Sequence, residues 1–378
     1  MCAFIHHTRL DHLLRPQDYS SHEFWQAEMS HLFQQSWQYA GQAEDLARPG
    51  SYFARDIAGV PVVVRNFDGE LRAFRNICPH RHTMMVGEGS GCTARLKCMY
   101  HGWEFGSEGQ VTHLPDGPSF RGVRMDEHKL CPVRLERLGS MLFVNLSPNG
   151  PSMREGLTSL VPELDQYFGN HTFIWRWVTE HPVNWKIIEE NAVESYHVPM
   201  THPGTYGQYK APELHDHQLE PGYTRYADLE PWKNSIVGRG FRLLSKLFLP
   251  RPNYERFKHA HLFPNNLLYY NELLSTWAFL QPLSPGRTRY ELLAFIPRNV
   301  RGGSISRLAL RLLVQPLVRQ FARILKEDMD LWPRIHHGLA HSPHHGVLSC
   351  REERVHAFQK YVVEGMKDKR LPDTRQKT

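Results

Sequence analysis

The chain has 378 residues, of which 41% are hydrophobic and 22% charged, with a formal net charge of +6. This length allows two domains with a core each, and the composition is ordinary for a globular protein. Basic and acidic residues interleave, no apolar run is long enough to cross a membrane, and the N-terminal segment MCAFIHHTRL lacks the pattern of a secretory signal. We therefore expect a cytoplasmic protein whose partners include neither nucleic acid nor a membrane.

The first third of the chain predicts a helix followed by short strands. Ser20 and Glu23 form a capping-box pattern, and large apolar residues at helical spacing follow, which predicts one amphipathic helix over residues 21–38. From about residue 50 the period changes to two, and Asp68-Gly69 is a typical hairpin turn between two strand-like runs. We expect an N-terminal helical segment over 1–42 and an antiparallel β domain over 43–150.

The remainder, residues 151–378, mixes both types of element. We expect a helix over 182–196, strands over 266–281 and 287–297, and helices over 304–340 and 350–365. Pro316 should break or kink the first of these last two helices. Ser349 and Glu352 form a second capping box. Residues 203–260 have no clear period, so we expect loops and short helices there. Strands grouped before closing helices indicate an α+β chain.

Two mixed pairs of metal-ligating residues lie in the β domain. Cys78 and His80 form a C-x-H pair, and Cys98 and His101 form a C-x2-H pair. Two thiolates and two imidazoles suit a Rieske [2Fe–2S] cluster, in which the cysteines hold one iron and the histidines the other. The alternative is a structural zinc site, but zinc modules usually pair Cys with Cys and His with His. The pairing therefore favours the Rieske cluster.

These pairs lie in segments that are similar to a known family. The stretch CPHR…CMYHGWEF, and the run VVVRNFDGELRAFRNICPH before it, resemble the large (alpha) subunits of Rieske non-haem iron aromatic-ring-hydroxylating oxygenases. The resemblance implies an N-terminal Rieske β domain followed by a helix-grip (START-like) catalytic domain. The chain departs from the family at His82, where a Gly or Ala usually follows the Arg, and this departure concerns the backbone of the first loop.

A second motif lies about 100 residues further on. Glu194, His197 and His202 give E-x2-H-x4-H, and the predicted helix places Asn191 on the same polar face, with Pro199 ending the helix. On spacing alone, this is equally well an exposed polar helix face with two incidental histidines. However, the run NWK-x3-EN-x2-E-x-YH-x4-H resembles the catalytic helix of the same family.

The resemblance implies that His197, His202 and one carboxylate hold a mononuclear Fe(II), which leaves coordination positions open. We assign the carboxylate to Asp328 and expect its neighbours Glu327 and Asp330 to be solvated. Asn191 and Glu194 are assigned as catalytic, Glu194 as the acid that bridges the iron site to the cluster of a neighbouring subunit.

The resemblance further implies the terminal oxygenase of a multicomponent system, which hydroxylates, dihydroxylates or demethylates a small organic substrate with O2. Electrons from NAD(P)H would come through a separate reductase, with or without a ferredoxin, because the chain has no dinucleotide-binding G-x-G-x-x-G unit. A homotrimer is expected. The alternatives are a Rieske-type electron-transfer protein and a zinc-binding scaffold without oxygenase activity.

The identity of residue 194 indicates which branch of the family the chain resembles. Family members with Glu instead of Asp at this place include enzymes that act on quaternary ammonium compounds, so the substrate is either such a compound or an aromatic one. Several aromatic side chains could form a cage for a cation, although we expect them to pack instead: Tyr206, Tyr209, Tyr223, Tyr226 and Trp232.

Overall fold

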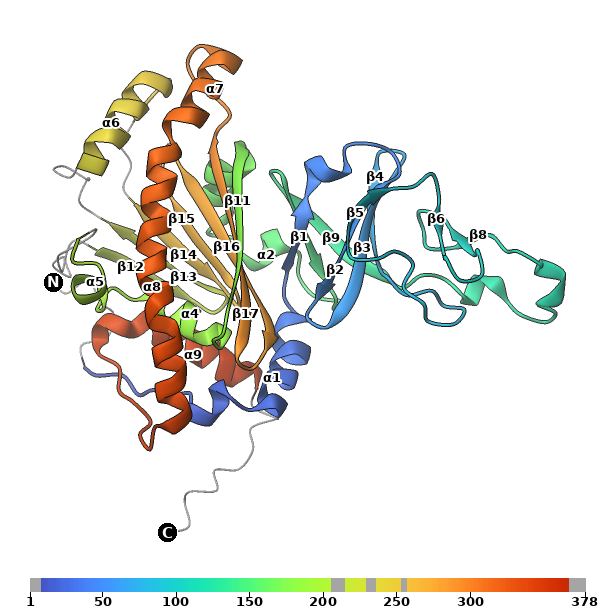
Figure 1. The fold of residues 1–378 in the computed structure, drawn as a ribbon, viewed down its shortest axis with the longest axis horizontal. Helices are drawn as coiled ribbons and strands as arrows, with labels where there is room; N and C mark the ends of the chain where they lie inside the picture. The colour runs from blue at the N-terminus through green and yellow to red at the C-terminus, as the bar shows by residue number, and fades with distance from the viewer. Residues whose placement is uncertain (1–7, 205–214, 229–235, 253–256, 367–378) are drawn as a thin grey trace, which may run out of the picture. The chain divides into compact units, whose positions relative to one another are not determined.

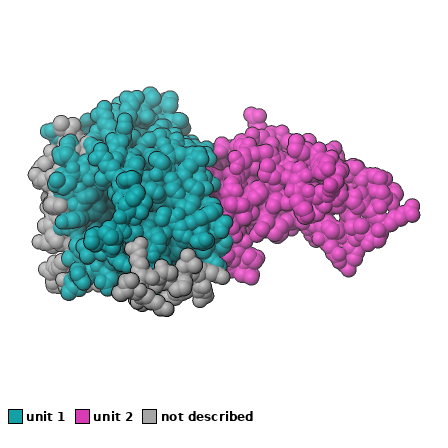
Figure 2. Space-filling model, turned by 60° about the horizontal axis from the view of Figure 1, so that its bottom comes forward, with its two compact units in different colours: residues 1–32, 157–378 teal, residues 33–156 magenta. Residues whose placement is uncertain are grey.

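Antiparallel sheets form the centre of both units into which the chain divides in the computed structural model. One unit is residues 33–156, and the other combines residues 1–32 with 157–378 (Figure 2). The structure describes residues 8–204, 215–228, 236–252 and 257–366. The predicted α+β class is confirmed. The predicted domain boundaries at 42 and 150 stay a prediction.

Antiparallel strands and the loops between them form the unit of residues 33–156. Its described residues form a seven-stranded sheet in the order β1-β10-β9-β4-β3-β2-β5 and a three-stranded sheet in the order β6-β7-β8. The bounds are β1 Gln38–Gln42, β2 Ser51–Ile57, β3 Val60–Phe67, β4 Glu70–Arg75, β5 Gly89–Cys92, β6 Leu96–Lys97, β7 Glu104–Phe105, β8 Val111–His113, β9 Pro132–Leu138, β10 Met141–Asn145 and the short helix α2 Met153–Gly156.

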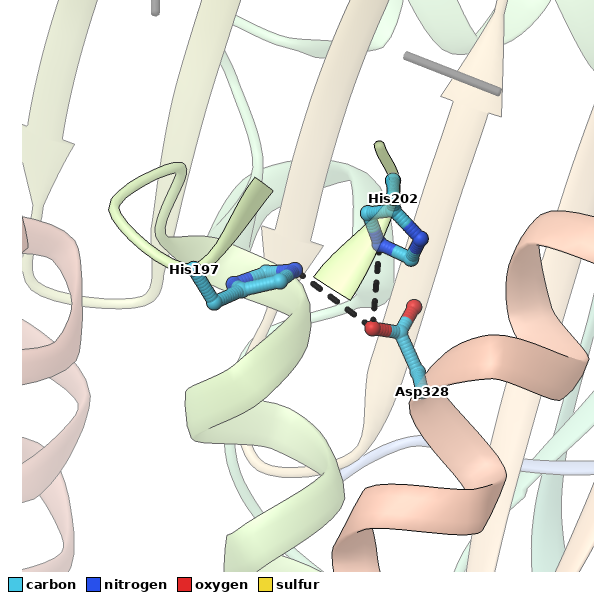
Figure 3. A group of neighbouring side chains, drawn as sticks. All are labelled: His197, His202 and Asp328. Atoms are coloured by element: carbon cyan, nitrogen blue, oxygen red, sulfur yellow. Dashed lines mark ion pairs between the residues drawn. The ribbon is translucent and has the colours of Figure 1, made fainter. Parts of the chain in front are cut away.

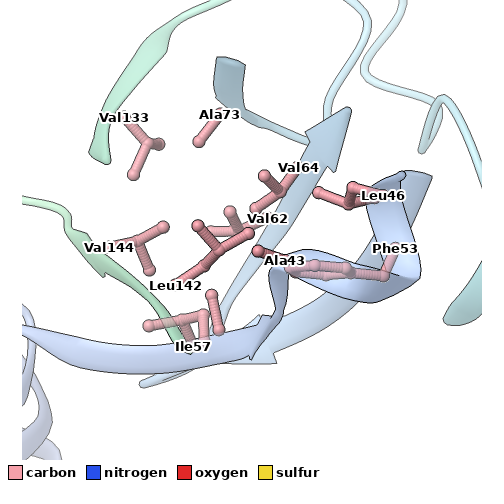
Figure 4. Close-up of a cluster of buried hydrophobic side chains, with 11 residues drawn as sticks. Ala43, Leu46, Phe53, Ile57, Val62, Val64, Ala73, Val133, Leu142 and Val144 are labelled. Atoms are coloured by element: carbon pink, nitrogen blue, oxygen red, sulfur yellow. The ribbon is translucent and has the colours of Figure 1, made fainter. Parts of the chain in front are cut away.

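The hairpin of β3 and β4 forms where the sequence predicts it. Asp68 and Gly69 have φ angles of 51° and 103°, so both turn residues adopt the left-handed backbone of a tight hairpin. The Asn66 side chain accepts the Gly69 N–H at 2.6 Å. The inward-facing Val62 and Val64 then pack in an apolar core that includes Phe53, Leu142 and Val144 (Figure 4). This core includes Ala73 of β4, the strand that leads into the loop of Cys78 and His80.

The other unit contains a second seven-stranded sheet within its described residues, in the order β11-β17-β16-β15-β14-β13-β12. Helices α4, α8 and α9 cover one face of it (Figure 1). The bounds are α1 His22–Glu28, α3 Val161–Leu164, β11 His171–His181, α4 Trp185–Val193, α5 Val198–Thr201, β12 His215–Glu220, β13 Tyr223–Asp228, α6 Ile236–Phe248, β14 Lys258–Leu262, β15 Asn266–Tyr270, β16 Ser275–Ser284, β17 Arg287–Pro297, α7 Gly303–Leu313, α8 Gln315–His341 and α9 Glu353–Gly365.

Two predicted helix features appear at the expected places near the C-terminus. The predicted break near Pro316 separates α7 from α8. Pro316 lies in the first turn of α8, where a backbone N–H has no intrahelical acceptor, so the missing N–H of proline costs no hydrogen bond. The capping box of Ser349 and Glu352 is present directly before α9. No helix in the described part of the chain is long and apolar enough to cross a bilayer.

The predicted helix over 21–38 is wrong at its C-terminal end. Ser21, not Ser20, caps α1, and after a π-helical turn the helical segment ends at Phe33. Residues 34–37 instead connect to the β unit, where Gln34 donates to the carbonyl of Ala58 and Trp37 lies under the guanidinium of Arg134. Contacts with distant residues thus override the helical pattern here.

Candidate metal centres

The two predicted cluster loops have the same backbone pattern. In the first, the Cys78 N–H donates to the Thr83 carbonyl at 2.9 Å, and His82 N–H donates back to the Cys78 carbonyl at 3.0 Å. In the second, Cys98 N–H donates to the Trp103 carbonyl at 2.8 Å, and Gly102 N–H donates to the Cys98 carbonyl at 3.0 Å. Each loop therefore closes tightly around its cysteine.

The four predicted ligands converge at the tips of these loops. Cys78 and Cys98 are both buried, and their sulfurs lie within hydrogen-bonding reach of each other. The rings of His80 and His101 lie with their centroids 4.6 Å apart. Trp103 stacks on His80 at 4.8 Å and fixes the orientation of that ring. The two loops thus bring two thiols and two imidazoles together, as the sequence predicts.

Electrostatics at this site suit a metal cluster better than free side chains. Burial, with a smaller contribution from the adjacent Cys98, raises the pKa of the Cys78 thiol to about 11, so a free Cys78 thiolate is disfavoured here. The backbone N–H groups of His80 and Arg81 point toward the Cys78 sulfur, as donors that stabilise a metal-bound sulfur. The buried Nδ1 of His101 has no hydrogen-bond partner within the described residues. The residues therefore fit a [2Fe–2S] cluster.

The second predicted site is assembled from three separate segments. Helix α4 ends at Val193, and Glu194 is already extended, so His197 does not lie on the α4 face as predicted. Pro199 does not end α4 either; it lies in the first turn of the short helix α5. His197 and His202 flank α5 at its two ends. The carboxylate of Glu194 accepts the backbone N–H of His197 at 3.2 Å, which holds this sharp bend.

His197, His202 and Asp328 offer ligand atoms that all lie within 4.8 Å of one another (Figure 3). Both Nε2 atoms face Asp328 Oδ1, at 3.4 Å from His197 and 3.1 Å from His202. Asp328 lies in the middle of α8 and is buried. Two imidazoles and one carboxylate on one side of a site are the ligand set of non-haem Fe(II) oxygenases.

Carboxylates also hold the far nitrogen of each histidine. Glu194 contacts Nδ1 of His197, and Glu327 lies 2.7 Å from Nδ1 of His202. A carboxylate acceptor places the ring proton on Nδ1 and leaves the Nε2 lone pair for a metal. The contact of Glu327 with His202 differs from the solvated side chain that we expected from the sequence, whereas Asp330 is exposed as expected.

The charge balance of the site favours a cation. Burial lowers the pKa of His197, but its contacts with Asp328 and Glu194 outweigh burial and raise it to about 9. Burial likewise raises the pKa of Asp328, but the two histidines outweigh it and the net shift is downward. Positive charge is therefore stabilised between these groups, and a bound metal ion supplies it without protons.

Asn191 lies on α4, where it is buried. Its Oδ1 accepts the indole N–H of Trp332 at 2.7 Å, which ties α4 to α8 one turn after Asp328. This contact shows how Asn191 is held, and its assignment as a catalytic residue stays a prediction.

Family models match both units of the chain. Residues 168–368 match the ring hydroxylating alpha subunit (catalytic domain), and residues 36–125 match the Rieske [2Fe-2S] domain. The chain belongs to the ring-hydroxylating alpha-subunit family. Its predicted cofactors, a Rieske cluster and a mononuclear iron, are thereby confirmed, and electrons from NAD(P)H through a reductase are typical of the family.

Several relatives of this alpha subunit share part of its sequence. The oxygenase subunit of carnitine monooxygenase from Escherichia coli is 34% identical over 191 residues, 49% of this chain and 51% of that protein. The oxygenase subunit of glycine betaine monooxygenase from Chromohalobacter salexigens is 30% identical over 201 residues, 51% and 44% of the two chains. Choline monooxygenase from Atriplex hortensis is 30% identical over 206 residues, 52% and 45%. The chain spans about half the length of these relatives.

Solved structures share the fold over nearly the whole chain. A quaternary ammonium Rieske monooxygenase in complex with L-carnitine has a TM-score of 0.72 at 21% identity and covers 93% of this chain and 95% of its own. Naphthalene 1,2-dioxygenase from Rhodococcus sp. has a TM-score of 0.71 at 18% identity, and 95% of each chain is covered. At these identities the likeness shows the fold alone.

The suggested aromatic cage is not assembled from its described members. Tyr223 and Tyr226 are three residues apart on β13, so their side chains point to opposite faces of the sheet. Tyr206, Tyr209 and Trp232 lie outside the described residues.

Proposed function

We propose that this alpha subunit is the terminal oxygenase of a Rieske non-haem iron system that oxidises a small quaternary ammonium compound. The convergence of His197 and His202 on Asp328, with a carboxylate behind each histidine, carries this proposal. One oxygen atom of O2 enters a C–H bond of the substrate, and the other leaves as water with two protons and two electrons from NAD(P)H. A plain electron-transfer protein or a zinc scaffold has no need of this second site.

The substrate class rests on two observations. The relatives named above carry the names carnitine, glycine betaine and choline monooxygenase. Residue 194 is Glu, the residue that the sequence resemblance associates with this branch. An aromatic substrate is the second candidate, because naphthalene 1,2-dioxygenase shares the fold.

Each residue of the site has a defined task in this proposal. His197, His202 and Asp328 would hold the iron, which activates O2 when bound. Glu194 and Glu327 orient the two imidazoles and keep their Nε2 lone pairs free, while Asn191 fixes α4 against α8 through Trp332.

The test compares the purified chain with two variants of α8. Wild type, supplied with a surrogate reductase and NADH, is expected to oxidise at least one of carnitine, glycine betaine and choline. Asp328→Ala should lose its mononuclear iron and its turnover while the Rieske absorption stays. Asp330→Asn, an exposed acid on the same helix, should keep both. Full activity of Asp328→Ala would overturn the ligand assignment, and zinc without acid-labile sulfide at Cys78 would overturn the oxygenase assignment.

We further propose a homotrimer in which the cluster of one subunit transfers electrons to the mononuclear iron of the next subunit. Glu194 would lie between His197 of its own subunit and His101 of the neighbour. A carboxylate suits this position because it accepts hydrogen bonds from both imidazoles. Co-expression of the two inactive variants Cys78→Ser and His197→Ala should restore some activity, since some junctions then pair an intact cluster with an intact iron site. A mixed oligomer with loaded metals and no turnover would exclude this route.

A further inference from the structure

Helix α7 exposes an apolar stripe on the side opposite to its packed face. Ile305, Leu308 and Leu312 follow one another at i, i+3 and i+7, and their exposed fractions are 83%, 60% and 66%. The opposite side of the helix contributes Leu310, which is fully buried in a core cluster. The helix is thus already anchored by one apolar face while a second one points into solvent.

Helix α6 repeats this arrangement beside α7. Phe241, Leu244 and Phe248 pack against the same core cluster as Leu310. On another side of α6, Leu243 and Leu247 lie one turn apart and are 58% and 55% exposed. Both helices lie at one end of their unit, beyond the sheet and next to the start of α8 (Figure 1).

The charged residues of these two helices and of the segments that flank them along the chain are all of one sign. Within the described residues 236–252 and 298–326, the sequence has no Asp or Glu. The basic residues there are Arg239, Arg242, Lys246, Arg251, Arg298, Arg301, Arg307, Arg311, Arg319, Arg323 and Lys326. We call the exposed apolar residues of α6 and α7, with the basic residues of these two helices, the α6–α7 face. These basic residues are Arg239, Arg242, Lys246, Arg307 and Arg311.

We propose that the α6–α7 face docks the protein onto an anionic lipid surface. Amphipathic helices with exposed aliphatic side chains and arginine or lysine beside them lie in the headgroup region, where the aliphatic groups enter the acyl boundary and the cations contact phosphates. The large excess of positive charge supplies the complementarity to anionic lipids. The proposal is independent of the oxygenase activity proposed above.

Other occupants fit this face less well. A two-fold contact between copies would place the same basic residues against each other, which costs energy. A contact of the proposed homotrimer joins two different faces of the subunit, and the size-exclusion measurement below tests for it. Protein interfaces are enriched in aromatic residues, whereas the exposed large side chains of α6 and α7 are Leu and Ile. Helix α8 rises about 1.5 Å per residue, so its start lies roughly 20 Å from Asp328 along the axis. The proposed lipid contact therefore lies toward the end of α8 that is distant from Asp328.

This proposal departs from the expectation that no membrane is a partner. The net charge of +6 for the whole chain does not reveal this local excess, because the remaining segments carry all of the acidic residues. A docked helix also needs no membrane-spanning length, so a search for long apolar runs does not detect it.

The test is flotation of the full-length chain with vesicles. We expect binding to vesicles of equal parts phosphatidylglycerol and phosphatidylcholine, with binding at least about tenfold weaker to phosphatidylcholine alone and at high salt. The triple variant Ile305→Ser/Leu308→Ser/Leu312→Ser and the double variant Arg239→Gln/Lys246→Gln should each lose most of this binding. Val347→Ser, which changes a 73% exposed side chain after α8, is the apolar control. Arg48→Gln/Arg121→Gln, two exposed residues of the β unit, is the charge control.

The outcomes separate lipid from protein occupants. Iron content and circular dichroism of each variant should match wild type, because the substituted residues are exposed. Wild type that remains unbound to anionic vesicles overturns the proposal, as do α7 variants that float like wild type. A change of oligomeric state in the triple variant during size exclusion would also overturn it and assign the face to a contact between copies.

Discussion

His82 and Gly102 occupy equivalent positions in the two cluster loops, and both have a left-handed backbone, with φ angles of 60° and 76°. Each lies four residues after its cysteine and donates its N–H to the carbonyl of that cysteine. Glycine adopts this conformation freely, whereas a side chain there costs about 1 kcal/mol. The departure from the family at His82 therefore places strain in one loop that the other loop lacks.

The substitution His82→Gly should relieve this strain and stabilise the β unit by about 1 kcal/mol. Gly102→Ala should destabilise it, since a Cβ there lies 3.2 Å from Pro115 Cγ in addition to the unfavourable φ. Gly87→Ala is the control, because Gly87 has neither a positive φ nor an atom within 4 Å of the added Cβ. The loss of the visible absorption of the cluster during urea unfolding measures the stability of all three variants. A destabilised His82→Gly variant would show that the imidazole makes a stabilising contact.

The fully buried ion pair of Lys186 and Glu28 gives the second prediction. Their Nζ and Oε1 atoms are 2.6 Å apart, both side chains are 0% exposed, and the Trp185 indole donates to the other oxygen at 3.1 Å. Lys186→Met leaves a buried carboxylate without its cation and should cost about 3–5 kcal/mol in unfolding free energy. The double variant Glu28→Leu/Lys186→Met should recover most of this loss, because it removes both charges.

An exposed ion pair serves as the control for this cycle. Arg287 and Glu180 are 60% and 40% exposed, so Arg287→Met should change the unfolding free energy by less than about 1 kcal/mol. Chemical denaturation followed by tryptophan fluorescence measures all four proteins. A double variant as unstable as Lys186→Met would contradict the argument, since the loss would then come from packing and not from the unpaired charge.

Local patterns were sufficient where each element follows its own apolar period. The Asp68-Gly69 hairpin, the strand over 287–297 and the capping box of Ser349 and Glu352 all lie where the sequence predicts them. Spacing and family resemblance also predicted the candidate ligands that the structure brings together at both sites, because each motif is contiguous apart from Asp328.

Strands β12, β13 and β14 were missed because their inward face is polar. On the paired strands β13 and β14, Tyr226 lies opposite His259 and Thr224 lies opposite His261. Arg354 of α9 donates to Thr224 at 3.0 Å and lies 2.7 Å from His259 Nδ1, so these polar groups are satisfied only in the folded chain. The alternation of apolar and polar residues, on which strand prediction depends, is therefore absent.

The third prediction concerns His171, whose two ring nitrogens are buried without hydrogen-bond partners in the described structure. Burial, with a smaller contribution from Arg298, lowers its pKa to about 4. Between pH 6.5 and pH 4 the imidazole is protonated in the unfolded chain but neutral in the folded chain. The free energy of unfolding therefore falls as the pH decreases through this range, by up to about 3 kcal/mol. His171→Leu should remove this part of the pH dependence. The exposed His344→Gln should keep it, as measured by denaturation at pH 5 and pH 7.

The last prediction tests the contact of Glu327 with His202. Its carboxylate lies 2.7 Å from Nδ1 and is 35% exposed, so it fixes the ring while remaining partly solvated. Glu327→Gln keeps the shape but removes the charge that makes the imidazole a strong ligand, and Fe(II) affinity should fall by about 10–100-fold. The Rieske absorption should stay unchanged, because no residue of the cluster loops is altered. Competition with a chelator measures the affinity, with Asp330→Asn as the control that removes an exposed charge from the same helix. An equal loss of Fe(II) affinity in both variants would mean that nearby negative charge in general is responsible. A loss in Glu327→Gln alone would assign the effect to the contact with His202, since only Glu327 makes that contact.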